Sequence, residues 1–335
     1  MRAVVLVGGF GTRLRPLTVG VPKQMLPIVH VPMIERVVGG LAAYGVTEAI
    51  LSLGYRPDAF LEAYPDGICA GIPLHYAVEP EPLDTAGAIR FAARHAGVDS
   101  TFVVVNGDVI NEFDLGALVA LHRRAGAEGT IHLTPVDDPS RYGVVPTDER
   151  GRVEGFIEKP PRDEAPTNWI NAGTYVFEPS VLDRIPDGRP VSVERDTFPA
   201  MVRDASLYAL QDPCYWVDAG TPATYLQVNL DLVAGRRGTT EAAWHPSATV
   251  HPRAMVKDSV LGPGVRVGAD AVVVDSVVLD DAEVGAGARV EYSVVGRRAS
   301  LGDRAEVANL TVIGHGEHVP AGGVFDGQRV PDVAT

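Results

Sequence analysis

The chain has 335 residues, of which 46% are hydrophobic and 21% are charged, and its formal net charge is −14. A single hydrophobic core stops growing at about 250–300 residues, so this length and composition predict a globular protein with two domains. The acidic charge argues against nucleic acid as a partner, and two cysteines are too few for a disulfide framework or a Cys-only zinc site.

Membrane and export signals are not evident in the sequence. No apolar run approaches the roughly 18–20 residues of a membrane span, and the apolar run at the N-terminus is too short for a signal peptide. We therefore expect a cytoplasmic protein without a membrane partner.

The first thirty residues carry the strongest local signal. Residues 3–7 are a short apolar run typical of a buried parallel strand. Glycines and spaced polar or cationic residues follow it directly: Gly8, Gly9, Gly11, Thr12, Arg13, Arg15 and Lys23. Glycines let backbone N–H groups approach phosphate oxygens, and Arg and Lys supply positive charge. The segment from Met1 to Arg36 holds five Lys or Arg and one Glu in an acidic chain. This pattern favours a nucleoside triphosphate site.

Two commoner phosphate loops do not fit this segment. The dinucleotide fingerprint needs a third glycine where Leu14 stands, and the P-loop needs a Gly-Lys-Ser/Thr tripeptide that the sequence lacks. An ordinary strand-to-helix turn would explain the paired glycines alone, but it would not explain the cations.

Strands and helices then alternate along the chain. We expect helices over 32–45 and 85–95, and strands over 48–53, 74–78 and 101–106. Short apolar strands alternating with helices predict a Rossmann-like, doubly wound and mostly parallel sheet. Ligands bind such sheets beyond the carboxyl ends of the strands.

Two carboxylates are predicted to hold a metal ion. Asp108 follows the apolar strand over 101–106, and Asp218 ends a short apolar stretch before Thr221, which is suited to cap a helix beginning at Pro222. Mg²⁺ usually takes one or two carboxylates, with substrate phosphates completing its coordination. The alternative for Asp108 is a helix-capping role.

A hairpin is expected between these two carboxylates. Residues 142–145 and 152–157 read as its strands, joined through Glu149–Gly151. The hairpin delivers Glu158 and Lys159, a pair suited to a sugar 1-phosphate because ammonium binds phosphate and carboxylate binds hydroxyls. The alternative is a surface ion pair.

A repeat of 17 residues begins near residue 248. One register holds Val250, Val267, Val284 and Leu301, a second holds Val256, Val273, Val290 and Val307, and a third holds Ser259, Ser276 and Ser293. Three registers in step predict a left-handed parallel β-helix of hexapeptide repeats with about four coils. We divide the chain into a catalytic domain, 1–235, and a β-helix domain, 246–330, joined by a linker over 235–244.

The motifs together resemble one family. GGFGTRLRPLT followed by PKQMLP is similar to the signature of the sugar-1-phosphate nucleotidyltransferases, and FIEKP, the NAG segment near Asn171, and WVDAGTP resemble other elements of that family. With PLDTAG, VERDTFP and a β-helix tail, the chain is most similar to the mannose-1-phosphate guanylyltransferases. The resemblance implies a reaction of GTP with mannose 1-phosphate that releases pyrophosphate.

The resemblance also implies roles for individual residues. Those implied to be catalytic are Arg13, Lys23 and Asp108. Those implied to bind the nucleotide are Leu6, Gly8, Gly9, Gly11, Thr12, Arg13, Arg15, Glu79, Asp84, Thr85 and Gly107. Those implied to bind the sugar phosphate are Gly143, Glu158, Lys159, Asn171 and Gly173. Asp108 and Asp218 are the implied ligands of Mg²⁺.

Two positions near the base leave alternatives open. One carboxylate, from Glu79 or from Glu81, could accept both guanine donors, and we prefer Glu79. Asp84 stands where the family has glycine; Asp tolerates a left-handed backbone better than most residues, so the turn can survive. A different base, or a heptose or cyclitol 1-phosphate, therefore remains an alternative. Ser192 is either a helix cap or a sugar contact.

Other function classes compete less well. A non-catalytic, nucleotide-binding regulatory subunit would have lost catalytic residues that are present here, and a pure scaffold would lack the α/β domain. The β-helix could carry an acyltransferase site, but its histidines lie at its ends, so we expect it to mediate homo-oligomer assembly.

Overall fold

The structure, a computed structural model, describes residues 1–9, 11–54 and 57–332. The chain divides into two units, described separately below. The first contains Met1–Gly9 and Ile34–Trp216; the second contains the described residues of Phe10–Met33 and Val217–Thr335. No helix among the described residues is long and apolar enough to cross a membrane.

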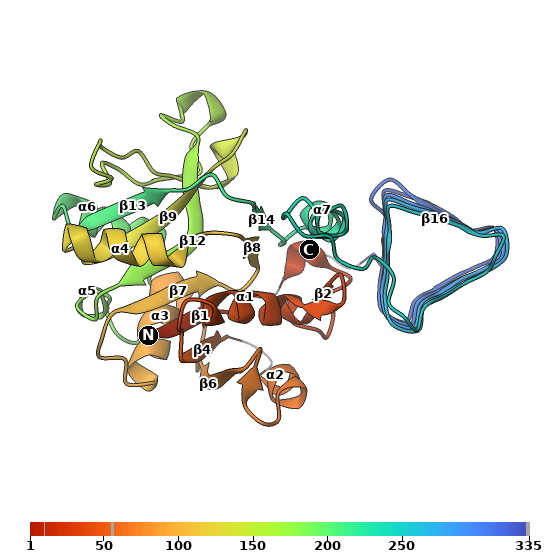
Figure 1. Ribbon diagram of the computed structural model, residues 1–335, viewed down its shortest axis with the longest axis horizontal. Coiled ribbons are helices and arrows are strands. Elements are labelled where there is room, and N and C mark those ends of the chain that lie inside the picture. The colour runs from red at the N-terminus through yellow and green to blue at the C-terminus, as the bar shows by residue number, and fades with distance from the viewer. Residues whose placement is uncertain (10, 55–56, 333–335) are drawn as a thin grey trace. The chain divides into compact units, whose positions relative to one another are not determined.

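A ten-stranded sheet forms the centre of the first unit (Figure 1). Along its main path the strand order is β11-β10-β12-β7-β1-β4-β6-β5, with β9 pairing with β12 and β13. The strands are β1 (Arg2–Leu6), β4 (Glu48–Leu53), β5 (Ile68–Cys69), β6 (Ile72–Val78), β7 (Phe102–Asn106), β9 (Gly129–Pro135), β10 (Gly143–Val144), β11 (Ile157–Glu158), β12 (Trp169–Phe177) and β13 (Leu207–Gln211). The short strands β8 (Val109–Asn111) and β14 (Trp216–Asp218) lie outside this sheet.

The parallel part of the sheet confirms the predicted Rossmann-like fold. β1 pairs in parallel with β4 and β7, and β4 pairs in parallel with β6. The antiparallel strands β12, β10 and β11 extend the sheet beyond β7. The centre of β1 is fully buried, as expected of an apolar run covered on both faces.

Helices cover this sheet. α3 packs against β1, β4 and β6, and α4 packs against β9 and β13. The helices of the chain are α1 (Met33–Ala42), α2 (Asp58–Ala63), α3 (Asp84–His95), α4 (Leu115–Ala125), α5 (Val181–Arg184), α6 (Phe198–Arg203) and α7 (Pro222–Val233). Short 3₁₀ turns form η1 (Thr12–Leu14), η2 (Lys23–Met25), η3 (Pro139–Arg141) and η4 (Arg162–Glu164), and η5 (Val193–Thr197) is a π-helical turn.

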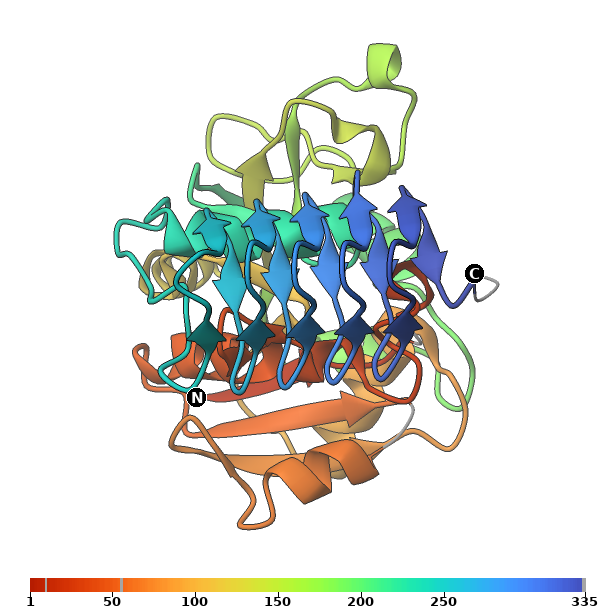
Figure 2. The ribbon, with the colours of Figure 1, turned by 90° about the vertical axis from the view of Figure 1, so that its right-hand side faces the viewer.

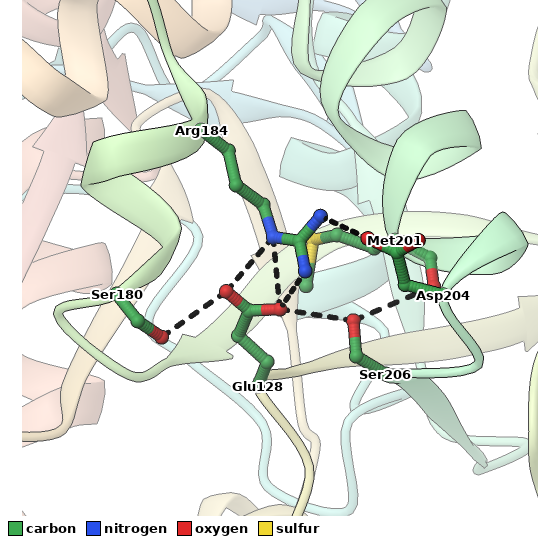
Figure 3. A network of polar contacts seen from close by, with 6 residues as sticks. All are labelled: Glu128, Ser180, Arg184, Met201, Asp204 and Ser206. Atoms are coloured by element: carbon green, nitrogen blue, oxygen red, sulfur yellow. Dashed lines mark hydrogen bonds and ion pairs between the residues drawn. The ribbon is translucent and has the colours of Figure 1, made fainter.

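A polar network fastens α5 and α6 to the start of β9 (Figure 3). The Arg184 guanidinium donates to both carboxylate oxygens of Glu128, from Nε at 2.8 and 2.9 Å, and to Asp204 at 2.6 Å. The hydroxyls of Ser180 and Ser206 also donate to Glu128. Five residues from three segments thus share one cluster of charge-assisted hydrogen bonds.

The second unit contains the parallel β-helix. Three five-stranded sheets run along it, and Figure 1 shows it end-on as a triangle, while Figure 2 shows its coils side by side. The first sheet contains β15 (Thr249–Val250), β18 (Arg266–Val267), β21 (Glu283–Val284), β24 (Ser300–Leu301) and β27 (His318–Val319). The second contains β16 (Met255–Lys257), β19 (Val272–Val274), β22 (Arg289–Glu291), β25 (Glu306–Ala308) and β28 (Val324–Asp326). The third contains β17 (Val260–Leu261), β20 (Val277–Val278), β23 (Val294–Val295), β26 (Val312–Ile313) and β29 (Arg329–Val330).

The three predicted registers are those of the structure. Val250 pairs with Val267, and Val256 with Val273, so equivalent apolar side chains stack from coil to coil. The serines form a ladder in which the N–H of Ser276 donates to the Ser259 hydroxyl and the N–H of Ser293 donates to the Ser276 hydroxyl, each at 3.1 Å. A buried hydroxyl thereby satisfies a buried backbone donor.

The predicted number of coils is too low, because each sheet has five strands among the described residues. The pairing offset is 17 residues as far as Arg289 with Glu306, and it becomes 18 where Val294 pairs with Val312. The extra residue lies near Asn309 and Leu310, both of which have positive φ. This single insertion ends the exact repeat in the sequence and conceals the last coil.

The remaining short strands, β2 (Pro27–Ile28) and β3 (Val31–Pro32), pair antiparallel in the second unit. They follow the loop that carries the predicted triphosphate residues.

Candidate active site

The carboxyl ends of the parallel strands bring the first group of predicted residues together. β1 ends at Leu6, just before Gly8 and Gly9, and β7 ends just before Gly107 and Asp108. The N–H of Gly107 donates to the carbonyl of Leu6 at 2.9 Å, which fixes these two strand ends side by side. Asp108 is half-buried, between the strand end and β8. The predicted placement at one edge of the sheet is confirmed.

Glu79 lies at the same edge, at the end of β6. Its carboxylate is almost fully buried and accepts hydrogen bonds from the Ser52 hydroxyl and from the N–H of Leu83, each at 3.1 Å. A Cβ atom on Gly8 would lie 4.0 Å from the Glu79 Oε1 atom, so the two residues are neighbours. Glu79 therefore holds the loop that leads into α3, whereas the Glu81 side chain is exposed. Each Glu79 oxygen keeps a second lone pair, and its role toward a base remains a prediction.

Asp84 opens α3 with a left-handed backbone, at φ +58°. This is the conformation that a glycine would adopt at no cost, and it explains how Asp occupies the position of the family glycine. The next residue, Thr85, joins α3 to η5: its hydroxyl donates to Glu194 and accepts from the N–H of Val193, each at 2.8 Å. The turn is thus preserved with Asp in place.

Ser192 is confirmed as a cap. Its hydroxyl accepts a hydrogen bond from the N–H of Arg195 at 3.2 Å, at the start of η5. It also donates to Glu194 at 2.8 Å. The alternative role of Ser192, a sugar contact, stays a prediction.

A hairpin forms between β10 and β11, but the predicted strand over 152–157 is shorter: β11 begins at Ile157, and Arg152 and Val153 form only isolated bridges. Gly143 pairs with Glu158, and a Cβ atom on Gly143 would lie 2.4 Å from the Phe156 ring, so only glycine leaves room for that ring. The ammonium of Lys159 lies 3.1 Å from Glu158 Oε1, and the Lys159 side chain is 59% exposed. This contact is the surface ion pair given above as the alternative; an exposed ammonium can still reach a phosphate from solution, and the sugar-phosphate role of the pair stays a prediction.

Asn171 and Gly173 lie at a bulge in β12. The Asn171 amide oxygen accepts from the N–H of Gly173 at 3.0 Å, and its amide nitrogen donates to the Tyr175 hydroxyl at 2.9 Å. The register of β12 against β9 shifts between Asn171 and Tyr175. Gly173 has φ +77°, and a Cβ atom there would lie 2.5 Å from the Asn106 amide. The bulge therefore places Gly173, in the segment predicted to bind the sugar, against Asn106, two positions before Asp108.

Trp216 is a neighbour of this segment that the sequence analysis did not assign. Its indole N–H donates to the carbonyl of Ala172 at 3.0 Å, and its ring meets that of Tyr142 edge-on at 5.4 Å. Its place in the WVDAGTP motif was the signal that could have identified it. Asn106 was also left unassigned, although it lies two positions before Asp108 in the same Asn-Gly-Asp stretch.

From Gly11 onward, the predicted phosphate loop belongs to the second unit. Gly11 has φ +60°, and a Cβ atom there would lie 3.0 Å from Thr18 and 3.3 Å from the Lys23 Cβ atom. The Thr18 hydroxyl donates to the Gly11 carbonyl at 2.7 Å. Thr12 and Arg13 lie in η1, directly after Gly11. The loop thus brings Gly11, Arg13 and Lys23 together, and Thr18, which the sequence analysis left out, closes it.

Asp218 lies beside Arg13 within the same unit. One Asp218 oxygen accepts from the N–H of Gly220 at 2.9 Å, and the other lies 3.9 Å from an Arg13 guanidinium nitrogen. A Cβ atom on Gly220 would lie 2.8 Å from that guanidinium, so any larger residue would make the Arg13 side chain shift. Thr221 caps α7 with a complete capping box, as predicted.

Both predicted metal ligands are of a chemical type that suits a divalent cation. Asp108 belongs to the first unit and Asp218 to the second, and each supplies carboxylate oxygens, the ligand type that hard cations prefer.

Comparisons with known proteins identify the family of the chain. Residues 2–235 match the family model of the nucleotidyl transferases, and residues 239–331 match that of the GMPPB C-terminal domain. A mannose-1-phosphate guanylyltransferase of Mycobacterium tuberculosis is 43% identical over 276 residues, which cover 79% of this chain and 76% of that protein. A mannose-1-phosphate guanyltransferase of Schizosaccharomyces pombe is 46% identical over 68% of this chain, and this chain spans 62% of its length. The solved structure of HddC from Yersinia pseudotuberculosis is 30% identical, covers 68% of this chain and 97% of its own, and has a TM-score of 0.59.

Proposed function

Because the chain belongs to the nucleotidyl transferase family, we propose that it transfers the guanylyl group of GTP to mannose 1-phosphate, forming GDP-mannose and pyrophosphate. One observation carries the choice of substrates: relatives named for this reaction are 43% and 46% identical to the chain over most of its length. Asp84 adopts φ +58°, a conformation open to glycine, so the departure from the family glycine is compatible with this choice.

The reaction is an in-line attack of a mannose 1-phosphate oxygen on the α-phosphorus of GTP. The bond from that phosphorus to the β-phosphate bridging oxygen breaks, and pyrophosphate leaves with its electron pair. The attacking phosphate is already anionic, so positioning and charge neutralisation carry the catalysis. No protein nucleophile is required.

Different Arg and Lys side chains have separate roles in binding the phosphates. Arg13 and Arg15 bind the β- and γ-phosphates and the departing pyrophosphate. Lys23 bridges the α-phosphate and the nucleophile, and Lys159 holds the attacking phosphate, with Glu158 beside it for sugar hydroxyls. The exposed side chains of Arg13 and Lys159 support these roles, since both can be reached by ligands from solvent.

Enzymes of this family use a divalent metal ion, and we propose Mg²⁺, with Asp108 and Asp218 as its protein ligands. When bound, the ion neutralises charge on the phosphates. Chelation followed by addition of single cations tests the choice: Mg²⁺ should restore turnover, and restoration by Zn²⁺ but not Mg²⁺ would contradict it.

The substrate choice is tested by pyrophosphate release with GTP, dTTP, ATP and UTP, each crossed with mannose, glucose and glucosamine 1-phosphates. Turnover with GTP and mannose 1-phosphate is expected. Turnover with another base would contradict the guanylyl assignment. GTP binding without turnover on any sugar would contradict the sugar assignment and favour a regulatory subunit or an unusual heptose or cyclitol phosphate.

We further propose that the β-helix domain, 246–330, assembles a homo-oligomer while residues 1–235 carry the catalysis. The sheet formed by β16, β19, β22, β25 and β28 exposes apolar side chains at both ends, with Met255 52% and Val324 64% exposed. A second copy packed against either end of this sheet would cover one of these side chains. Light scattering of the full chain should give a multiple of 35.5 kDa, and replacement of Met255 and Val324 by lysine should lower it.

A further inference from the structure

Three side chains with different donor atoms meet in the first unit, outside the transferase residues. His132 lies on β9, and Asp212 and Cys214 follow β13. The His132 Nε2 atom is 3.7 Å from the Cys214 sulfur and 3.8 Å from an Asp212 carboxylate oxygen. The three donor atoms all lie within 4.8 Å of one another.

These separations match ligands arranged around a common metal ion. A direct hydrogen bond between imidazole and carboxylate would bring nitrogen and oxygen to about 2.9 Å, a good deal shorter than the distance here. Around a tetrahedral zinc ion with bonds of about 2.0–2.3 Å, adjacent ligand atoms lie roughly 3.4–3.6 Å apart. Small movements of the half-buried Asp212 and Cys214 side chains would therefore complete the site.

The scaffold holds the donors in place. His132 is fully buried on a strand that pairs with both β12 and β13, and the Phe113 ring packs 5.1 Å from the imidazole. The N–H of Asp212 donates to the carbonyl of Leu133 at 3.0 Å. The Asp212 side chain is 27% exposed, which gives an ion a path from solvent.

We propose that His132, Asp212 and Cys214 bind one transition-metal ion, with zinc the best match and water in the fourth position. Imidazole, thiolate and carboxylate are the ligands that zinc uses, whereas magnesium avoids sulfur. The site is chemically different from the pair of carboxylates proposed for Mg²⁺, and it goes beyond the transferase reaction.

The surroundings predict a weak, exchangeable site. A metal-bound histidine usually donates its second ring N–H to an acceptor, and loss of that partner costs about 10–100-fold in affinity. Among the described residues, the His132 Nδ1 atom has no hydrogen-bond partner. Chelators should therefore empty the site without unfolding the chain, unlike a structural zinc centre.

Occupancy would affect the segment that follows. Cys214 is followed by Tyr215, whose carbonyl accepts from the N–H of Glu112 at 3.0 Å, and by Trp216, which binds the Ala172 carbonyl. An ion shared by β9 and this segment would fix Trp216 beside the residues proposed to bind the sugar phosphate. That consequence rests on the proposed function, whereas binding of the ion does not.

Cobalt is the probe that distinguishes this site. The full chain, prepared without a polyhistidine tag and stripped with a chelator, is titrated with Co²⁺ and followed by absorption. A tetrahedral site with a thiolate gives an ultraviolet sulfur-to-cobalt charge-transfer band and strong visible bands. An oxygen site gives neither. We expect saturation at one Co²⁺ per chain and displacement of the bands by Zn²⁺.

Matched variants identify the ligands. Cys214→Ser should abolish the charge-transfer band, and Asp212→Asn should weaken Co²⁺ binding at least tenfold. Cys69→Ser, which changes the other free cysteine, and Asp108→Asn should both leave the band intact. A chain that gives no band, or a band that survives Cys214→Ser, would overturn the proposal. Near-ultraviolet circular dichroism verifies that each variant is folded.

Discussion

The two groups of predicted site residues are positioned in different ways. In the first unit, Gly8 and Asp108 follow strands of the ten-stranded sheet, and Gly143 and Asn171 lie on strands of it. In the second unit, the predicted phosphate loop contains the 3₁₀ turns η1 and η2, and its backbone is hydrogen-bonded to side chains that come 198 to 314 residues later. The Tyr225 hydroxyl donates to the Pro27 carbonyl.

The β-helix contributes to this support. The Arg329 guanidinium, on the last strand, donates to the carbonyl of Arg15 at 3.1 Å. A Cβ atom on Gly314 would lie 3.2 Å from the Pro16 Cβ atom, so the coil approaches the loop closely. The positions of the site residues on the sheet therefore depend on strand register. The positions of the residues predicted to bind the triphosphate depend instead on side chains that are distant in the sequence. Substitutions in the β-helix should therefore alter the reaction at the phosphates, whereas substitutions at the outer edge of the sheet should not.

The largest effect is expected from Arg13→Ala. Removal of a preorganised cation at a developing charge costs about 10²–10³-fold in rate. We expect a loss of this size in kcat/KM for GTP, measured by pyrophosphate release, with partial recovery in Arg13→Lys. The sheet-borne counterpart, Lys159→Ala, should act on mannose 1-phosphate instead. An Arg13→Ala enzyme within tenfold of the parent would contradict the assigned role.

Asn229→Leu should produce the next largest effect, on stability. The fully buried Asn229 amide accepts from the N–H of Val29 at 2.6 Å and donates to the Tyr225 carbonyl at 2.8 Å. Leucine leaves the buried N–H of Val29 unsatisfied, which costs about 1–3 kcal/mol, whereas the Tyr225 carbonyl keeps its hydrogen bond within α7. Urea denaturation should show this loss, and Gln227→Leu, on the exposed face of the same helix, should not. Equal stability of the two variants would remove Asn229 as an anchor of the loop.

Arg329→Ala tests whether the β-helix positions the predicted phosphate loop. Loss of one charge-assisted hydrogen bond to the Arg15 carbonyl should change activity by up to about tenfold, equivalent to 1.4 kcal/mol. We expect a higher KM for GTP and an unchanged KM for mannose 1-phosphate, with recovery in Arg329→Lys. Arg253→Ala, which breaks an exposed ion pair with Asp270 in the same domain, is the control. If both variants behave alike, the contact does not position the loop.

The network around Glu128 provides the contrasting test at the edge of the sheet. Burial acts to raise the pKa of Glu128, but the Arg184 guanidinium and the Ser206 and Ser180 hydroxyls outweigh it and hold the pKa below its ordinary value. A lowered carboxyl pKa stabilises the fold above the pKa of the unfolded chain, and this contribution disappears as the pH falls through the folded pKa.

Glu128→Gln should therefore cost about 1 kcal/mol at neutral pH, since the pair is partly shielded from solvent, and should cost less as the medium becomes acidic. Unfolding curves at several pH values measure this convergence. Activity at neutral pH should stay unchanged, because the network touches none of the proposed site residues. A drop in the kcat of Glu128→Gln would show that the outer edge of the sheet also affects the reaction, contrary to the expected difference from the β-helix.

The sequence predicted those parts whose signal is local. Apolar runs predicted β1, β4 and β7, and repeat spacing predicted the three faces of the β-helix, because each pattern needs only neighbouring residues. The last coil was missed because one inserted residue shifts the period. The bond between Arg329 and Arg15 spans 314 positions, and no spacing rule connects them. The two hydrogen bonds to Glu79 likewise depend on packing that no motif encodes.

The smallest effect is expected at Asp84, where the local backbone decides the outcome. A left-handed conformation costs an ordinary residue about 1–2 kcal/mol, and Asp pays less because its short side chain bonds locally. Here Asp84 Oδ1 accepts from the N–H of Thr85 at 2.7 Å. Asp84→Gly removes that bond but also relieves the strain of the left-handed backbone. Glycine costs about 0.5–1 kcal/mol because it gives the unfolded chain more conformational entropy. The net change in the free energy of unfolding should therefore lie near zero. Asp84→Ala loses the bond without relieving the backbone and should be about 1 kcal/mol less stable. If alanine and glycine are equally stable, the positive φ at this turn is not what selects the residue, and Asp84 is then retained for contact with a ligand.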